Sequence, residues 1–150
     1  MRGQLTSPEA VRNYLLAGHA TFTVQARESG KRFTFKFDRP EAEPGRDRPV
    51  WVKVMDGSNN ETDFAFLGTL WPRTNGWEYK RSPKSRVSDQ ALSAKAAKWL
   101  LGCLTVSEAA LLTQAEVWHE GHCGRCGRKL TVPESIETGL GPECAKRSAA

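Results

Sequence analysis

The sequence predicts an α+β fold, made of an antiparallel sheet of about five strands with flanking helices and a small C-terminal module. Five short segments alternate apolar and polar residues with a period of two, which is typical of strands that have one buried face. The segments before and after them have the periodicity of amphipathic helices. Three of the four cysteines follow residue 117. We therefore expect two units, residues 1–117 and residues 118–150.

The first predicted element is a short helix over residues 8–17. Ser7 can cap its N-terminus, Pro8 fits its first turn, and Gly18 can end it. Apolar residues recur at helical spacing in this segment, so one face of the helix is expected to pack against the rest of the protein.

Five strands are predicted to follow, and the loops between them indicate antiparallel pairing. The strands are "TFTVQA" (21–26), "RFTFKF" (32–37), "PVWVKVM" (49–55), "DFAFLGTL" (63–70) and "WEYK" (77–80). The first two are joined by "ESGK", a glycine-containing turn that is typical of a hairpin. In the fourth strand, Phe64 and Phe66 are expected to point into the core with Leu70.

One face of the predicted sheet is basic and includes an aromatic residue. The positions that the alternation places outward are Arg32, Thr34, Lys36, Trp51, Lys53, Glu78 and Lys80. Such a face can hold a single nucleic-acid strand through phosphate contacts and base stacking. A solvated face, or one covered by a helix, is also compatible with this pattern.

The positive charge of the chain is concentrated in one segment. The formal net charge is +5, and residues 72–100 contain seven basic and two acidic residues. This segment is a candidate for attracting phosphate backbones or an acidic protein surface. The alternative is a solvated loop and helix face.

Helical periodicity returns after "RSPKSR". Ser88 is expected to cap a helix that ends near Gly102. Thr105 and Glu108 fit a capping box, which predicts a second helix that runs through Val117.

Composition argues against a membrane protein. The hydrophobic content of 39% and the charged content of 26% are typical of a soluble globular protein. The chain has no apolar run of about 18 residues, and its start lacks the features of a signal peptide. We expect a cytoplasmic protein with no membrane partner.

The C-terminal segment has the cysteine spacing of a zinc-knuckle or treble-clef-like module. Cys123 and Cys126 form a C-x-x-C pair, and Gly127 after it lets the backbone turn and direct amides toward sulfur. Cys144 follows "GLGP", where the start of a helix would favour a thiolate. Few large apolar residues occur in this segment, so bound metal must supply much of its stability. We therefore expect one structural Zn²⁺.

The fourth zinc ligand is predicted to be His119, which has room to turn back toward Cys123. His122 is the first alternative, but it is adjacent to Cys123, and two consecutive residues seldom reach one ion without strain. Cys103, water or an outside ligand are the others. A redox C-x-x-C pair, a disulfide and a catalytic zinc are alternative interpretations of these cysteines, but the sequence context favours a closed structural site.

The run "HEGHCGRCGRKLTVPESIETGLGPEC" resembles a zinc-binding family of unknown function from phage, prophage and bacterial genomes. The resemblance implies that His119, Cys123, Cys126 and Cys144 bind metal. The residues that it implies shape the loop are Gly127, Arg128, Leu130, Pro133, Ser135, Gly139, Gly141 and Pro142. Upstream segments such as "KRFTFKF" and "KRSPKSRVS" extend the resemblance over most of residues 20–145. His122 departs from the family pattern, and the resemblance implies no known activity.

The sequence favours a binding protein over an enzyme. It lacks a P-loop, a G-x-S-x-G motif, an H-E-x-x-H motif and a carboxylate cluster with two-metal spacing. His19, at the end of a predicted helix, is interpreted as a capping or surface residue.

We therefore expect a non-catalytic, zinc-stabilised nucleic-acid-binding accessory protein of phage or mobile-element type, with weak sequence selectivity. The residues expected to contact nucleic acid are Arg32, Lys36, Trp51, Lys53, Lys80, Arg81, Lys84, Arg86, Arg125, Arg128 and Lys129. The alternative is a protein-interaction module, for example a phage inhibitor of a host defence complex.

Overall fold

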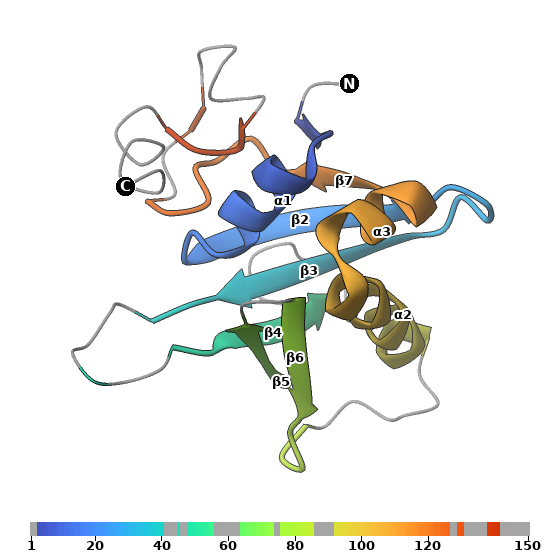
Figure 1. Cartoon of the computed structure of the whole chain (residues 1–150), viewed down its shortest axis with the longest axis vertical. Coiled ribbons are helices and arrows are strands. Elements are labelled where there is room, and N and C mark those ends of the chain that lie inside the picture. The colour runs from blue at the N-terminus through green and yellow to red at the C-terminus, as the bar shows by residue number, and fades with distance from the viewer. Residues whose placement is uncertain are drawn as a thin grey trace.

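The computed structural model describes residues 3–40, 45, 48–55, 64–73, 76–85, 92–126, 129–130 and 138–141. In chain order its elements are β1 (Gln4–Leu5), α1 (Pro8–Leu15), β2 (His19–Ala26), β3 (Arg32–Asp38), β4 (Val50–Met55), β5 (Phe64–Arg73), β6 (Gly76–Arg81), α2 (Leu92–Val106), α3 (Glu108–Gln114) and β7 (Ala115–His119). The strands form one antiparallel sheet with the order β1-β7-β2-β3-β4-β5-β6. The helices lie on one face of this sheet (Figure 1).

The described residues form a mostly β structure, so the prediction of an α+β fold with about five strands is wrong. The sheet has seven strands, and three short helices pack on it. The five predicted strands correspond to β2 through β6, whereas β1 and β7 were not expected. No zinc site is shown for the predicted zinc-knuckle or treble-clef-like module, much of which, including Cys144, lies outside the described residues. Within the described ranges, no three His, Cys, Asp or Glu side chains lie together in a way that could hold a metal ion.

Strand β7 lies where the sequence predicts the end of a helix. Helix α3 stops before it, because Ala115 is already extended, with φ −151° and ψ 158°. β7 then inserts between β1 and β2, and Val117 pairs with Val24. Ala115, Val117 and His119 are buried while the residues between them are more exposed. This alternation is a strand pattern, but it spans only five residues and is too short to override the preceding helical periodicity.

The helix ends agree with the sequence prediction at Ser7 and differ from it at Gly102 and Thr105. Ser7 caps α1 as predicted, since its hydroxyl accepts a hydrogen bond from the backbone N–H of Ala10 at 3.1 Å. Gly102 does not end α2, which continues to Val106. Ser107, rather than Thr105, caps α3. None of the helices in the described part of the chain is long and apolar enough to cross a membrane.

A β-bulge reverses the expected side-chain directions at the start of β5. The register between β4 and β5 shifts beside Lys53, and Leu67 takes the buried position. Phe64 and Phe66 therefore point to the face opposite the core, so their predicted inward orientation is wrong. Gly68 lies at this shift, where a Cβ atom would collide with the backbone of β6. Glycine thus allows β5 and β6 to approach closely at the bulge.

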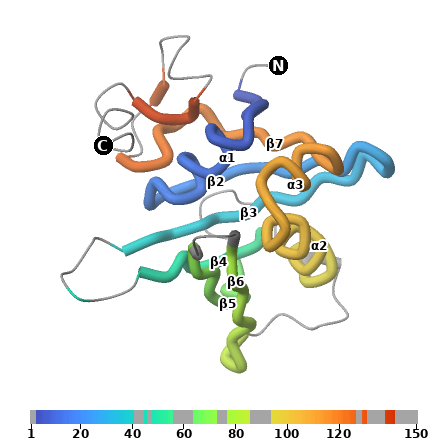
Figure 2. Tube along the Cα trace, viewed as in Figure 1, coloured from blue at the N-terminus to red at the C-terminus, as the bar shows by residue number. Residues whose placement is uncertain are grey.

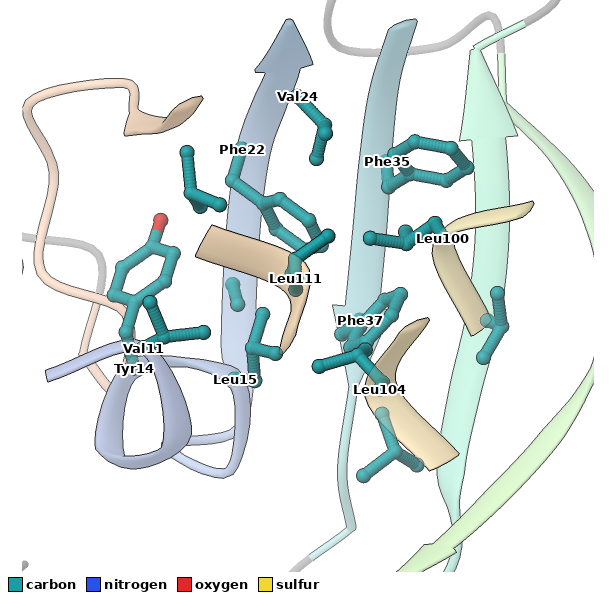
Figure 3. Packing of buried hydrophobic residues seen from close by; sticks show 14 of the residues in the cluster. Val11, Tyr14, Leu15, Phe22, Val24, Phe35, Phe37, Leu100, Leu104 and Leu111 are labelled. Atoms are coloured by element: carbon teal, nitrogen blue, oxygen red, sulfur yellow. The ribbon is translucent and has the colours of Figure 1, made fainter. Parts of the chain in front are cut away.

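The hydrophobic core lies between the sheet and the three helices (Figure 3). Labelled core residues are Val11, Tyr14, Leu15, Phe22, Val24, Phe35, Phe37, Leu100, Leu104 and Leu111. The Phe22 ring packs edge-on against Phe37, with 4.9 Å between centroids, and stacks beside Phe35 at 5.9 Å. Burying each such side chain contributes about 1.5–3 kcal/mol relative to leaving it exposed.

The N-terminal segment lies beside β7 (Figure 2). The backbone N–H of His119 donates to the carbonyl oxygen of Gly3 at 2.9 Å, and Gln4 pairs with Trp118 across β1 and β7. The expected boundary between residues 117 and 118 therefore falls inside β7, and Trp118 and His119 belong to the sheet.

Candidate functional site

The face of the sheet that points away from the helices carries lysine and aromatic side chains, and we call it the helix-free face. Its side chains from β3 to β6 are Lys36, Trp51, Lys53, Phe64, Phe66, Thr69, Trp71 and Lys80. Their strand neighbours Phe35, Phe37 and Val52 point the other way and are fully buried under the helices. The alternation read from the sequence correctly placed Lys36, Trp51, Lys53 and Lys80 outward, together with Arg32.

The strand register arranges the helix-free face in two adjacent rows. The first row, across β3, β4 and β5, is Lys36, Lys53 and Phe66. The second row, across β3 to β6, is Asp38, Trp51, Thr69 and Lys80. Side chains directly opposite each other in an antiparallel pair have Cβ atoms about 4.5–5.5 Å apart. Lysine and aromatic side chains therefore lie next to one another on this face.

The aromatic rings of this face are partly stabilised by one another and by the lysines. Trp51 is 42% exposed, and its ring lies 5.4 Å from that of Phe66 with a tilt of 43°. Lys36 Nζ lies 5.6 Å from the centroid of Phe64. Lys80 Nζ lies 5.8 Å from that of Trp71. These distances are typical of cation–π contacts.

Carboxylates lie close to each of the three lysines. Lys53 Nζ donates to Asp38 Oδ2 at 2.9 Å. Lys80 Nζ is 3.6 Å from Glu78 Oε1. Desolvation raises the pKa of Glu120, and the positive charges of His122 and Lys36 oppose this rise. The helix-free face is therefore less positive than its lysines alone would make it.

Four of the other residues predicted to contact nucleic acid are described, and they lie outside this part of the sheet face or at its end. Arg81 ends β6, and Lys84 lies exposed in the turn that follows. Arg125 and Lys129 flank the second cysteine of the C-x-x-C pair in sequence and belong to the C-terminal segment. Arg86 and Arg128 lie outside the described residues.

Cys123 and Cys126 lie in a tight turn that we call the cysteine hairpin, residues 121–130, of which 127–128 are outside the described part. Its two arms are joined by a bridge between His122 and Lys129, and Leu130 N–H donates to the Gly121 carbonyl at 2.8 Å. Both cysteines are free thiols. The predicted pair is thus held at the tip of a hydrogen-bonded hairpin.

The thiol of Cys123 is surrounded by hydrogen-bond donors. Burial of this thiol raises its pKa. Hydrogen bonds from the backbone N–H groups of Gly141, Cys126 and Arg125 and from the thiol of Cys126 outweigh this effect and lower the pKa to about 7. The Arg125 N–H lies 3.4 Å from Cys123 Sγ. Such amides stabilise the thiolate form, which is the form that binds metal. The hydrogen bond between the two cysteine side chains also brings their sulfurs together.

Tyr14 of α1 connects the cysteine hairpin to the core. A Cβ atom added at Gly124 or at Gly139 would lie 2.6 Å from the Tyr14 ring. Gly124 N–H donates to the Gly139 carbonyl at 2.8 Å, and Gly139 has a φ of +75°. The Tyr14 hydroxyl donates to the carbonyl oxygen of Thr21 at 2.7 Å. Two backbone segments can pack on the ring because neither has a side chain there.

His119 is buried at the end of β7, beside Tyr14, with 5.8 Å between ring centroids. Its Nδ1 accepts a hydrogen bond from the Gly121 N–H at 2.9 Å. In a neutral imidazole this arrangement leaves the proton on Nε2. His119 therefore binds a metal only if the contact with Gly121 is lost. His122 is exposed.

The remaining ligand candidates are placed only in part. Cys144 lies outside the described residues, as do Gly127, Pro133, Ser135 and Pro142 of the implied loop-shaping set. Cys103 lies on α2 and packs against the core, and burial raises its pKa. The described chain thus brings Cys123 and Cys126 together and places His119 next to Tyr14.

Sequence reasoning missed Tyr14, Phe64 and Phe66 as parts of these sites. Tyr14 falls within the helix predicted over residues 8–17, but nothing in the sequence singled it out. Phe64 and Phe66 were assigned to the core, because a bulge cannot be read from alternation alone. The signal that was available is Gly68, since an isolated glycine inside a strand pattern often marks a bulge.

Comparison with known proteins adds information on the C-terminal segment alone. Residues 114–148 match a family of unknown function, DUF6011. The match begins at the last residue of α3 and includes β7 and the cysteine hairpin. Its description names neither zinc nor phage. No curated protein and no solved structure matches the chain.

Proposed function

We propose that this protein is a non-catalytic nucleic-acid-binding accessory protein that binds through the helix-free face. The observation that carries the proposal is that Lys36, Lys53 and Lys80 share one sheet face with Trp51 and Phe66 on neighbouring strands. Lysine ammonium groups contact phosphates, and aromatic faces stack on bases. Each stacked base contributes about 1–3 kcal/mol, and stacking tolerates any base because every base has a π-face. Weak sequence selectivity follows.

A structural Zn²⁺ at the cysteine hairpin is the second part of the proposal. Cys123 and Cys126 fit a zinc site because their sulfurs are adjacent and backbone amides stabilise the thiolate. Cys144 is proposed as the third ligand. It follows Gly141 by three positions, so covalent geometry keeps their Cα atoms within about 11 Å.

His119 is the proposed fourth ligand and His122 the alternative. Zinc would hold the hairpin in one conformation and so fix the positions of Arg125 and Lys129. The resemblance of this segment to a zinc-binding family from phage genomes supports a cytoplasmic role in a phage or mobile element.

The proposal is tested by titrating labelled single-stranded and double-stranded oligonucleotides with the full chain at several salt concentrations. Three phosphate contacts by Lys36, Lys53 and Lys80 predict a slope of log affinity against log salt of about −2 for a single strand. The variant Lys36→Gln/Lys53→Gln should lose most of this binding. Lys95→Gln/Lys98→Gln is the matched control, because both lysines are exposed on α2, on the other side of the sheet. Equal losses in the two variants would contradict the proposed face.

A protein partner is the second candidate. The carboxylates beside the lysines favour it, since a surface of mixed charge with exposed aromatic residues is also typical of protein interfaces. Purification of the chain from its native cells distinguishes the two. A stoichiometric protein partner without nucleic acid supports an interaction module, including an inhibitor of a host defence complex, and bound nucleic acid supports the first proposal.

A further inference from the structure

We infer that the ligand of the helix-free face is a single strand of nucleic acid, with a base stacked on the Trp51–Phe66 pair and a phosphate that replaces Asp38 at Lys53. This inference rests on the proposed function and specifies the form of nucleic acid that binds. It also assigns a role to Asp38, which the sequence did not indicate.

The ion pairs of the face argue against a duplex. A duplex presents mainly phosphates to a flat sheet, so its affinity depends on unpaired cations. Lys53 already contacts Asp38 at 2.9 Å, and Lys80 lies 3.6 Å from Glu78. A phosphate that binds either lysine must displace the paired carboxylate or bind despite its electrostatic repulsion. A ligand that gains only phosphate contacts therefore binds this face weakly.

The Trp51–Phe66 pair provides a stacking surface that is accessible to unpaired bases but not to the bases of a duplex. Bases in a duplex are stacked on one another, whereas unpaired bases are free to stack on protein rings. Lysines lie over Phe64 and Trp71, but none of the described cations lies over the ring of Trp51. Trp51 is also the most exposed aromatic residue among those described, and Phe66 supports its ring from the side. The first base is therefore assigned to Trp51.

Asp38 lies where a phosphate next to that base would bind. It is opposite Trp51 in the register of β3 and β4, and its Oδ2 contacts Lys53 Nζ. Its other oxygen, Oδ1, is 3.7 Å from His19 Nδ1. In the free protein this carboxylate lies between Lys53 and His19 and occupies the position that a phosphate on Lys53 would take. It competes with phosphate there, so removing its charge should strengthen binding.

The experiment compares a labelled thymidine oligonucleotide of about 15 nucleotides, within the range that single-strand-binding folds cover, with its uridine counterpart and with a duplex of equal length. The full chain should bind the single strands at least about tenfold more tightly than the duplex. The two single strands separate DNA from RNA, and stronger binding of either one supports the inference.

Variants identify the two subsites. Trp51→Leu should weaken single-strand binding by about fivefold to a hundredfold, and Trp51→Phe should retain most of it. Asp38→Asn should strengthen binding severalfold at low salt. Glu116→Gln is the matched control, because Glu116 also forms an ion pair, with Arg27 at 3.5 Å, but on β7 and away from Trp51. It should leave affinity unchanged.

The outcomes separate this inference from the proposed function. If duplex and single strand bind equally and Trp51→Leu has no effect, the single-strand inference is wrong while nucleic-acid binding stands. If Asp38→Asn and Glu116→Gln change the affinity for single strands equally, the role given to Asp38 is wrong. If no oligonucleotide binds the wild-type chain at low salt, both the inference and the proposed function are overturned.

Discussion

The sheet and the cysteine hairpin are stabilised in different ways. In the sheet, fully buried rings such as Phe22 and Phe35 fill the space under the helices. The hairpin is attached through the face of Tyr14, a few backbone hydrogen bonds and the amides around Cys123. Packing therefore determines the geometry of the sheet, whereas polar contacts and the proposed metal determine that of the hairpin. This difference predicts that mutations can unfold one region without the other.

The largest separable effect is expected from Cys123→Ala. The apparent free energy of structural zinc binding in small peptides is about 10–16 kcal/mol. Losing one ligand should therefore unfold the chain after β7. The strands should remain folded. Limited proteolysis with mass mapping should detect new cleavage after His119, and a chelator should reproduce it in the wild-type chain.

Cys103→Ala is the control for that variant, because Cys103 is a thiol on α2 outside the hairpin. It should leave the cleavage pattern unchanged. If residues 120–150 of the Cys123→Ala variant resist proteolysis as well as those of the wild-type chain, Cys123 is not a metal ligand.

The opposite separation is expected from Phe22→Ala. Phe22 contacts Phe35, Phe37 and Tyr14, so its truncation leaves a cavity in the core and costs about 3–5 kcal/mol. The free energy of unfolding, measured by urea denaturation of the whole chain, should fall by that amount. A fall of only about 0.5 kcal/mol, the usual range for an exposed site, would contradict the packing described for the sheet.

Gly139→Ala tests the contact between the two regions at Tyr14. The new methyl group would meet the Tyr14 ring at 2.6 Å, and the φ of +75° disfavours any residue with a Cβ. We expect a local cost of about 1–3 kcal/mol, seen as faster amide exchange at residues 121–126. Gly102→Ala is the control, because no atom lies within 4 Å of a Cβ there. Similar exchange in both variants would argue against docking on Tyr14.

The smallest effect concerns Glu108, which links three elements on the helix side. Burial alone raises its pKa, but the indole of Trp77 at 2.7 Å and the guanidinium of Arg12 at 3.1 Å lower it below the ordinary value. A lowered pKa means that the stability from this carboxylate is present above the unfolded-state pKa and is lost as pH falls through the folded-state pKa. Glu108→Gln should flatten the decrease in thermal stability below about pH 4.5, near the unfolded-state value. An unchanged acid profile would contradict this linkage.

The alternation of short strands was a reliable guide to the sheet, because each strand from β2 to β6 is long enough to display its period. β1 has only two residues, and it exists because Gln4 and Leu5 pair with β7. β7 itself depends on pairing with β1 and β2, which no local pattern encodes. Tertiary pairing thus outweighed the helical periodicity that precedes Ala115.

The candidate sites were predictable to different extents. Lys36, Trp51 and Lys53 could be assigned to one face because alternation fixes side-chain direction. The bulge beside Lys53 could not be read in this way, so Phe66 was assigned to the wrong face. Cysteine spacing indicated that Cys123 and Cys126 come together, but no pattern indicates that the Nδ1 of His119 accepts a hydrogen bond from Gly121.

The central claim is that nucleic acid binds the helix-free face at Trp51. Heteronuclear NMR spectra recorded while a single-stranded oligonucleotide is added to the full chain test it most directly. We predict that the indole signal of Trp51 and the amide signals of Lys36 and Lys53 shift with increasing ligand, while those of Lys95 and Lys98 on α2 do not. Shifts confined to α2, or the absence of any shift at Trp51, would contradict the account.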